Sequence, residues 1–90
     1  MSTVRIPPTL RAATGGLKRV EVAGSTIREV LDGLLVAYPT LSAQLVDAAG
    51  APNRFINIFL NDTDVRHLDA LDTPVSDADS VVLLPAMAGG

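Results

Sequence analysis

The amino-acid sequence predicts an α+β domain in which one main helix packs against one face of a mixed β-sheet. The first observation is a single strongly amphipathic segment at residues 24–39, which carries signals for a helix start and a helix end. The second is a set of short apolar segments with strand-like alternation, two before this helix and three after it. The third is the length of 90 residues, which suits one small domain. This order of elements favours a sheet that is covered on one side.

Two strands joined as an antiparallel hairpin are predicted before the helix. Val4 and Ile6 share one face of the first strand, and the two prolines that follow end or bend it. Val20 and Val22 alternate with charged residues, which is typical of a half-buried second strand. The Thr-Gly-Gly segment at 14–16 predicts the hairpin turn, because glycine accepts the positive φ that such turns need.

The helix is the clearest element. Thr26 followed by Glu29 forms a capping box, in which each side chain can satisfy a free amide of the first turn. Apolar residues then recur at helical spacing and form one face: Ile27, Val30, Leu31, Leu34 and Leu35. Gly33 weakens the helix by about 1 kcal/mol relative to alanine. Pro39 ends it, because the residue before a proline avoids the α region.

Three further strands are predicted after the helix. Residues 40–47 are interpreted as a helical turn or a short second helix, and residues 48–53 as a loop. A strand follows within residues 54–62, with Ile56, Ile58 and Leu60 on one face and Phe55, Asn57 and Phe59 on the other. A tight turn then leads to a short strand from Val65 to Leu68. After a loop, residues 81–85 form a last strand that is apolar on both faces.

Several classes of chemistry lack the residues that they need. The chain has no cysteine, which excludes disulfides, thiolate metal sites and thiol nucleophiles. Its one histidine, His67, falls in a predicted strand and is interpreted as structural or exposed. Residues 62–64 and 77–79 resemble fragments of calcium loops but lack the full spacing, so we interpret them as turns. We therefore predict a non-enzyme with no metal site and no cofactor of its own.

Charge and hydropathy limit the class of partner. Seven basic and ten acidic residues give a net charge of −3, which argues against nucleic acid, because a basic patch is its usual footprint. Such a charge suits a partner with a basic docking surface, although solubility is the simpler explanation. No apolar segment approaches the roughly 20 residues that span a bilayer, and no signal peptide is recognisable. We expect no membrane partner and a cytoplasmic location.

The end of the chain is the remaining candidate for chemistry. Gly89 and Gly90 have no Cβ, so the chain can enter a narrow cleft there, and Ala86 and Ala88 keep the approach slim. From Pro85 onward the chain can reach about 20 Å when extended, at ~3.3–3.6 Å per residue. We predict that the carboxylate of Gly90 is the working group, the alternative being an unused, frayed terminus.

A docking surface is expected beside this end of the chain. Residues 1–85 are expected to form the domain and residues 86–90 a flexible tail. Phe59 lies on the opposite strand face from Ile58 and Leu60, so it remains partly exposed if the helix covers the Ile58 face; the alternative places Phe59 in the core. Exposed apolar side chains often mark interaction sites. The candidate partner-binding residues are Phe59, Val82, Leu84, Pro85, Ala86, Met87, Ala88 and Gly89.

Three segments together resemble one known family: residues 26–39 as the single helix, 55–65 as the central hairpin, and 71–90 as the end. This pattern resembles the MoaD/ThiS sulfur carriers, which have the ubiquitin-like β-grasp fold. The resemblance covers nearly the whole chain, and residues 54–68 with the Leu-Pro-Ala-Met-Ala-Gly-Gly ending look most like the CysO-type carriers of cysteine biosynthesis. Ala78 stands where the family commonly has the glycine of Asp-Gly-Asp, a loop change outside the tail.

The resemblance implies a carrier that acts as a protein cosubstrate. An E1-like enzyme would use ATP and Mg²⁺ to convert the Gly90 carboxylate to an acyl-adenylate, and a sulfur source would then displace AMP to leave a thiocarboxylate. In the CysO-type case a PLP-dependent cysteine synthase would accept the sulfur, and a metallopeptidase would later release cysteine from the carrier. The carrier would serve these enzymes and bind no cofactor itself.

Other functions remain open at this point. MoaD-type carriers supply sulfur to molybdopterin synthase and ThiS-type carriers to thiazole synthase for thiamin, and one carrier could serve several pathways. A ubiquitin-like modifier would instead join Gly90 to lysines of target proteins. A β-grasp binding module without tail chemistry is a third class.

Overall fold

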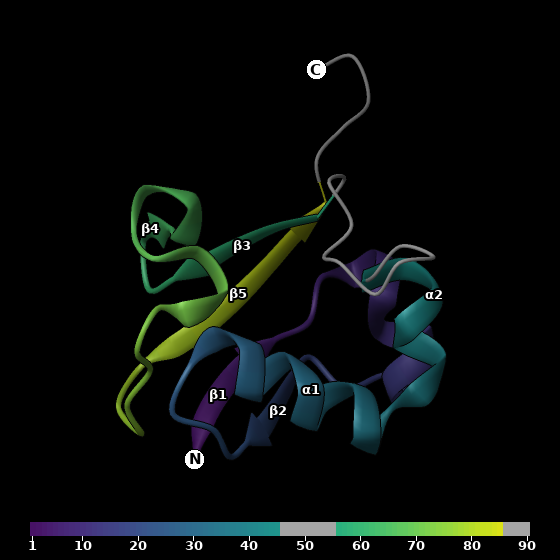
Figure 1. Ribbon diagram of the computed structural model, residues 1–90. Helices are drawn as coiled ribbons and strands as arrows, with labels where there is room; N and C mark the ends of the chain where they lie inside the picture. The colour runs from purple at the N-terminus through teal and green to yellow at the C-terminus, as the bar shows by residue number, and fades with distance from the viewer. Residues whose placement is uncertain (46–55, 86–90) are drawn as a thin grey trace.

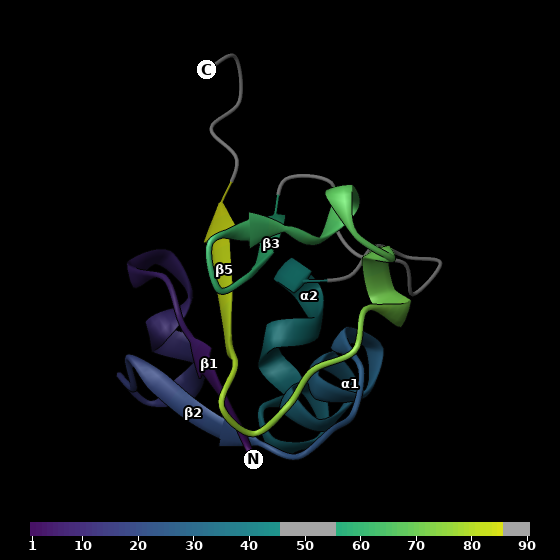
Figure 2. The ribbon, with the colours of Figure 1, turned by 90° about the vertical axis from the view of Figure 1, so that its left-hand side faces the viewer.

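One mixed sheet of five strands organises the molecule, in the order β2-β1-β5-β3-β4. The computed structural model describes residues 1–45 and 56–85. The strands are β1 (Ser2–Arg5), β2 (Arg19–Val22), β3 (Ile56–Leu60), β4 (Thr63–Asp64) and β5 (Ser80–Pro85). Two α-helices lie on one side of this sheet (Figures 1 and 2). The predicted α+β class is confirmed, as is the placement of two strands before the main helix and three after it.

The first and last strands lie side by side in the middle of the sheet. β1 pairs with β5 in parallel, with Val4 opposite Val81, and β3 pairs with the other edge of β5 in antiparallel fashion. β2 and β4 form the outer edges and each pairs antiparallel with its neighbour. β5 is therefore held on both sides by other strands.

The main helix, α1 (Ile27–Ala37), begins where the sequence predicts and buries the predicted apolar face. The amide of Glu29 donates to the Thr26 hydroxyl at 3.2 Å, and the Glu29 carboxylate accepts from the amide of Ser25 at 3.0 Å. Four residues of its apolar face are buried against the sheet, while Leu35 is partly buried: Ile27, Val30, Leu31 and Leu34. The 3₁₀ turn η2 (Pro39–Leu41) and the short helix α2 (Ser42–Leu45) follow, which confirms the short second helix.

Alternate residues of the central strands build the core. Val4, Val81 and Leu83 are at most 1% exposed, and Ile58 is 7% exposed. The intervening residues of β5 face the other way, with Leu84 44% exposed. The sequence leaves both faces of residues 81–85 equally apolar, and the structure shows that the Val81 and Leu83 face is the buried one.

The connection between β1 and β2 is longer than the predicted tight turn. The strands do form an antiparallel hairpin, but a 3₁₀ helix, η1 (Pro8–Thr14), lies between them. Pro8 starts this helix because it lacks the amide that a strand would need. The two glycines take positive φ angles, 70° at Gly15 and 89° at Gly16, and the Gly16 amide donates to the Arg11 carbonyl at 2.7 Å. The two glycines therefore end η1 and do not form a tight turn that joins the two strands directly.

The predicted strand from Val65 to Leu68 is wrong. β4 ends at Asp64, and residues Val65–His67 form a 3₁₀ helix, η3. The Asp64 carboxylate accepts from the amide of Arg66 at 2.9 Å, which caps that helix and diverts the chain from the sheet. A further 3₁₀ helix, η4 (Ala70–Asp72), lies within the expected loop. The predicted loop at 48–53 lies outside the described residues.

Gly24 joins β2 to α1 at a point where no side chain fits. A Cβ there would lie 2.8 Å from the backbone nitrogen of Val30 and 3.1 Å from the carbonyl carbon of Glu29. At Gly33 a Cβ would lie 2.8 Å from Cγ1 of Val22, which is a side-chain atom. The backbone of the first helical turn cannot move aside as a side chain can. A Cβ at Gly24 would therefore cause more strain than a Cβ at Gly33.

We expect Gly24→Ala to lower the free energy of unfolding by roughly 1–3 kcal/mol, as overpacking does. Gly33→Ala is the matched control, because alanine regains about 1 kcal/mol of helix propensity there and offsets part of its strain. Urea denaturation of both variants measures the difference. A smaller loss at Gly24 than at Gly33 would contradict this account.

Candidate functional site: the tail root and the outer face of the sheet

β5 fixes the point from which the C-terminal tail begins. It is in register with β1 from Ser80 to Val82 and with β3 from Val81 to Pro85, and its inward side chains Val81 and Leu83 are buried in the core. It ends at Pro85 at one end of the sheet (Figure 1). The candidate residues beyond it, Ala86, Met87, Ala88, Gly89 and Gly90, lie outside the described residues. Their predicted role and the tail boundary therefore stay predictions, while their attachment point is rigid.

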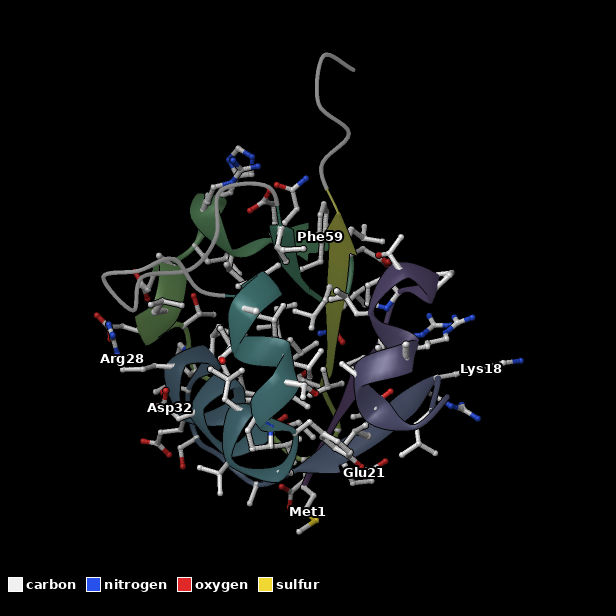
Figure 3. All side chains as sticks on the ribbon, turned by 90° about the vertical axis from the view of Figure 1, so that its right-hand side faces the viewer. Met1, Lys18, Glu21, Arg28, Asp32 and Phe59 are labelled. Carbon is white, nitrogen blue, oxygen red and sulfur yellow. The ribbon has the colours of Figure 1, made fainter. Side chains whose placement is uncertain are left out.

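Three candidate docking residues lie together on the outer face of the sheet. Phe59 of β3 stands directly opposite Val82 of β5, and Leu84 follows on the same face. Phe59 and Val82 are half-buried, and Leu84 is exposed. Figure 3 shows Phe59 alongside β5. We call Phe59, Val82 and Leu84 the outer patch.

The exposure of Phe59 follows from strand alternation. Its neighbour Ile58 points into the core at 7% exposure, and Ile56 and Leu60 pack against that core from the same face. Phe59 must then face outward. The expectation that Phe59 remains partly exposed is confirmed, and its placement in the core is excluded.

An ion pair that sequence reasoning missed borders the outer patch. Asp64 lies opposite Phe59 in the β3–β4 ladder, so the two side chains share a face. The Arg66 guanidinium donates to both oxygens of Asp64, with Nη2 to Oδ2 at 2.7 Å and Nε to Oδ1 at 3.1 Å. Asp64 is only 8% exposed, whereas the Arg66 side chain is 69% exposed. The Arg66 guanidinium is therefore held at the edge of the outer patch.

This ion pair shifts the titration of both groups. Hydrogen bonds from the Arg66 side chain, and then from its amide, lower the pKa of Asp64 from its ordinary 3.8 to about 2. The carboxylate in turn raises the pKa of Arg66. The sequence analysis interpreted residues 62–64 as a turn and placed Arg66 in a strand, so it did not connect the two side chains.

The loop before β5 is fixed by a second carboxylate. Asp79 accepts from the Ser76 amide at 2.9 Å and from the Asn61 side-chain amide at 3.2 Å, which lowers its pKa. Asn61 in turn accepts from the Ser80 amide at 3.1 Å, so the β3–β4 turn is tied to the start of β5. Among the described residues, the non-glycine residues with positive φ are Asn61 and Ala70. Ala78 therefore replaces a glycine without backbone strain.

The described residues offer little else for chemistry. His67 is exposed in η3. Within residues 1–45 and 56–85, no three acidic or histidine side chains gather where a metal could bind. No helix in the same ranges has the length and apolar character to cross a membrane. The tail root and the outer patch are therefore the candidate functional site.

Comparison with known proteins identifies the family. The model of the ThiS family matches residues 4–90. The sulfur carrier protein CysO of Mycobacterium tuberculosis is 46% identical over 90 residues, which cover 98% of this chain and 97% of CysO. The chain therefore belongs to the ThiS family.

Solved structures agree with this assignment. A chain of the Amycolatopsis orientalis BexX/CysO complex superposes with a TM-score of 0.89 at 42% identity, with all of both chains covered. The small archaeal modifier protein 1 of Methanosarcina acetivorans also gives a TM-score of 0.89, at 28% identity, covering 99% of this chain and 95% of that one. The ubiquitin-like β-grasp fold and the resemblance to CysO-type carriers are confirmed.

The Asp64–Arg66 pair predicts a pH-dependent contribution to stability. Folding lowers the pKa of Asp64, so the contribution is complete above the unfolded pKa near 3.8 and is lost as the pH falls toward about 2. We expect Asp64→Asn to be less stable than the unaltered chain at pH 5, with a gap that narrows between pH 4 and 2. Chemical denaturation at each pH measures this gap. Asp62→Asn in the adjacent exposed turn is the control; a gap for Asp64→Asn that stays constant with pH would contradict the assignment.

Proposed function

We propose that this chain is a sulfur carrier and that the C-terminal carboxylate of Gly90 is its working group. The observation that carries the proposal is 46% identity to a sulfur carrier protein over nearly the whole of both chains. The rigid end of β5 supports it, because a reacting group on a slim tail needs a fixed point of attachment. The carrier is a cosubstrate and leaves catalysis to its partners.

Activation begins with an adenylating enzyme of the E1 type. The Gly90 carboxylate attacks the α-phosphorus of ATP and pyrophosphate leaves, with Mg²⁺ held by that enzyme to balance the phosphate charge. Sulfide then attacks the acyl carbon, and AMP leaves with the electron pair. Where the donor is a persulfide, the attack first gives an acyl disulfide, and a thiol of the partner enzyme then attacks the donor sulfur and forms a disulfide with it, so that the thiocarboxylate leaves. The product is a thiocarboxylate on Gly90, in which sulfur replaces one oxygen. These reactions take place in the cytoplasm, where ATP is available.

The sulfur then passes to a biosynthetic enzyme. Similarity to CysO favours a PLP-dependent cysteine synthase as acceptor, with a metallopeptidase that later releases cysteine. The outcome of that transfer is a cysteinyl residue attached to the end of the carrier. MoaD-type or ThiS-type delivery is the alternative within the same class.

Docking of these enzymes is assigned to the outer patch. Phe59 of β3 and Val82 and Leu84 of β5 form a partly exposed apolar surface, and β5 leads to the tail. An enzyme that encloses the tail must approach this end of β5. The existence of a BexX/CysO complex for a similar chain supports the view that such carriers bind partner proteins through a stable surface.

A protein modifier is the second candidate function. The structural likeness to the small archaeal modifier protein 1 favours it. Both functions begin with adenylation of Gly90, so they differ only in the nucleophile that attacks next: sulfide for the carrier and a lysine amine for the modifier.

Removal of Gly90 is expected to abolish activation and to leave the fold intact. The tail follows the last core residue of β5, so its loss removes no buried side chain of the described core. ATP–pyrophosphate exchange with the cognate adenylating enzyme measures activation, and a thermal melt measures stability. Unchanged exchange after the deletion would exclude the carrier and the modifier together.

The intact mass after activation separates the two functions. With adenylating enzyme, ATP, Mg²⁺ and sulfide, the carrier gains the mass difference between sulfur and oxygen, and the gain is absent without ATP or Gly90. The chain has no cysteine that could imitate it. Addition of O-phosphoserine and a PLP-dependent cysteine synthase then extends a CysO-type carrier by one cysteine. A thiocarboxylate without that extension indicates another acceptor pathway, and isopeptide bonds to lysines indicate a modifier.

Truncation of Phe59 is expected to weaken docking more than folding. Phe59→Ala removes a half-buried side chain, so its loss of stability should fall below the roughly 3–5 kcal/mol typical of a buried phenylalanine. Binding to the adenylating enzyme, measured by titration calorimetry, should weaken. Ile58→Ala is the matched control: it removes a core side chain from the next position, so it lowers the melting temperature strongly. A large loss of stability with unchanged binding at Phe59 would refute the docking assignment.

A further inference from the structure

Two arginines stand opposite each other on the outer face of the sheet. Arg5 of β1 is in register with Arg19 of β2, and both residues are exposed. Arg5 is also in register with Val82 of β5, which belongs to the outer patch. Residues in register on neighbouring strands project to the same face, so the two arginines lie beside the outer patch. We call Arg5 and Arg19 the arginine pair.

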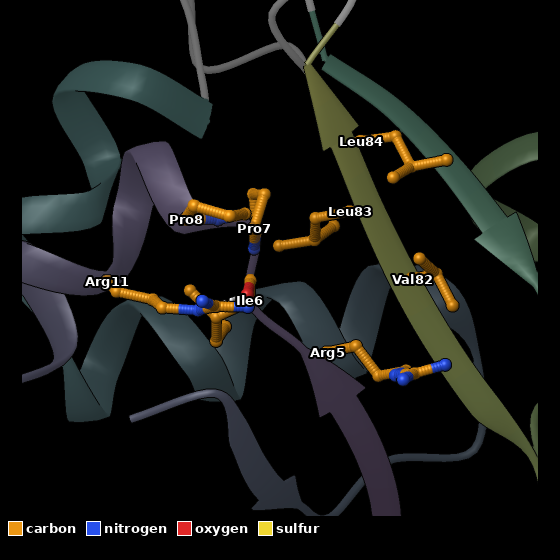
Figure 4. A pocket seen from close by; sticks show the side chains of 8 residues that line it. All are labelled: Arg5, Ile6, Pro7, Pro8, Arg11, Val82, Leu83 and Leu84. Atoms are coloured by element: carbon orange, nitrogen blue, oxygen red, sulfur yellow. Dashed lines mark hydrogen bonds between the residues drawn. The ribbon is translucent and has the colours of Figure 1, made fainter. Parts of the chain in front are cut away.

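The side chain of Arg5 follows this expectation (Figure 4). It points away from Arg11 and toward β5, from which Val82 and Leu84 project on the side opposite to Leu83. Leu83 is buried in the core, so the side that Arg5 shares with Val82 is the one that the two α-helices leave uncovered. The arginine pair and the outer patch therefore form one continuous surface.

The arginine pair is unfavourable for the folded chain on its own. Like charges directly opposite each other on neighbouring strands repel and destabilise a sheet. The ion pairs formed among the described residues involve neither arginine. Glu21, the acid of β2 on the same face, accepts from the Thr3 hydroxyl at 2.8 Å. Folding gains nothing from this arrangement, whereas an anion from outside would neutralise it.

The opposite side of the outer patch differs in charge. Asp64 stands opposite Phe59 in the β3–β4 ladder, and the Arg66 guanidinium donates to both of its oxygens. These two charges compensate each other. The arginine charges without an ion pair on this face therefore lie on β1 and β2, although the net charge of the chain is −3. Such an uneven charge favours one orientation of an acidic partner.

We propose that the arginine pair binds carboxylates of the adenylating enzyme while this enzyme covers the outer patch. Aspartate or glutamate side chains of the enzyme accept hydrogen bonds from the two guanidinium groups, and an apolar segment beside them packs on Val82 and Leu84. Hydrogen bonds between guanidinium and carboxylate groups are charge-assisted and oriented. The inference rests on the proposed activation of Gly90, and it names the chemistry of the surface that docks there.

Other occupants match this surface less well. A second copy of the chain offers Asp64 and Glu21 on the same face, and both already accept hydrogen bonds. A nucleic acid would meet an apolar centre on an acidic chain, whereas its usual binding sites are basic. An enzyme surface with apolar and acidic side chains fits both parts of the face.

Removal of one charge tests the proposal. Arg19→Gln is expected to raise the Kd for the adenylating enzyme at least about fivefold, mainly through slower association, and addition of Arg5→Gln is expected to raise it further. Lys18→Gln is the matched control, because Lys18 is the exposed neighbour of Arg19 and extends from the body of the molecule (Figure 3). It is expected to change the Kd less than about twofold. Titration calorimetry and stopped-flow mixing measure these values, and equal effects of Arg19→Gln and Lys18→Gln would overturn the proposal.

The stability of the free chain separates binding from a structural role. Arg19→Gln removes the repulsion from Arg5, so this variant is expected to unfold at the same urea concentration as the unaltered chain or at a higher one. Added salt is expected to narrow the difference in Kd between the two chains, because it screens exposed charges. A variant that loses stability together with binding would overturn the proposal.

Two measurements on the free chain test the other occupants. A dimer in analytical ultracentrifugation that Arg19→Gln dissociates would assign the arginine pair to a second copy. Binding of a short DNA duplex of mixed sequence that Arg19→Gln abolishes would assign it to nucleic acid. Either result would overturn the proposal, and we expect a monomer that does not bind the duplex.

The two levels of inference fail separately. If the unaltered chain supports no pyrophosphate exchange with the adenylating enzyme, the proposed function fails and this inference fails with it. If exchange is normal and the variant with both Arg5→Gln and Arg19→Gln binds as well as the unaltered chain does, only the assignment of the arginine pair fails.

Discussion

The parallel pairing of β1 with β5 is the contact on which the rest of the structure depends. It joins the two ends of the chain in the middle of the sheet, with Val4 and Val81 opposite each other and both fully buried. The amino group of Met1 and the hydroxyl of Ser2 add hydrogen bonds to Asp77 and Ser76 in the loop that leads into β5. Because most of the chain lies between the paired strands, this contact closes a long loop and forms only as the whole domain folds.

The same strand serves the core and the proposed interface with alternate residues. Val81 and Leu83 anchor β5 under the helices, while Val82 and Leu84 face outward beside Phe59. A period of two separates these roles cleanly, since neighbouring side chains point to opposite faces. The tail root can therefore be rigid while its outer surface remains available. If the outer patch is the docking surface as proposed, substitutions there change binding without removing core contacts.

Features that depend on neighbours in sequence could be predicted, and features that depend on neighbours in space could not. The start of α1 follows from Thr26 and Glu29, and its buried face follows from spacing alone. The end of β4 could not be predicted, because the side chain of Asp64 accepts from the amide of Arg66 and overrides the strand preference of Val65. The choice of buried face in residues 81–85 also needed the sheet, because both faces are equally apolar.

The same distinction applies to the two parts of the candidate site, the C-terminal tail and the outer patch. The Gly-Gly ending is visible in the sequence because the chemistry proposed for it needs only the last two residues. The pairing of Phe59 with Val82 joins strands that are distant in the sequence, and only the β3–β5 ladder shows that they are neighbours.

A carrier that serves several enzymes in turn constrains the strength of its own interface. In the proposed function, the adenylating enzyme and the sulfur acceptor must each enclose Gly90, so they cannot bind at the same time. A strong interface with either one would slow the transfer to the next, because differences in affinity among related complexes appear mainly in the rate of dissociation. The outer patch has three apolar side chains, of which two are already half-buried in the free chain. Such a small surface suits transient binding, because weak and transient complexes bury the smallest interfaces.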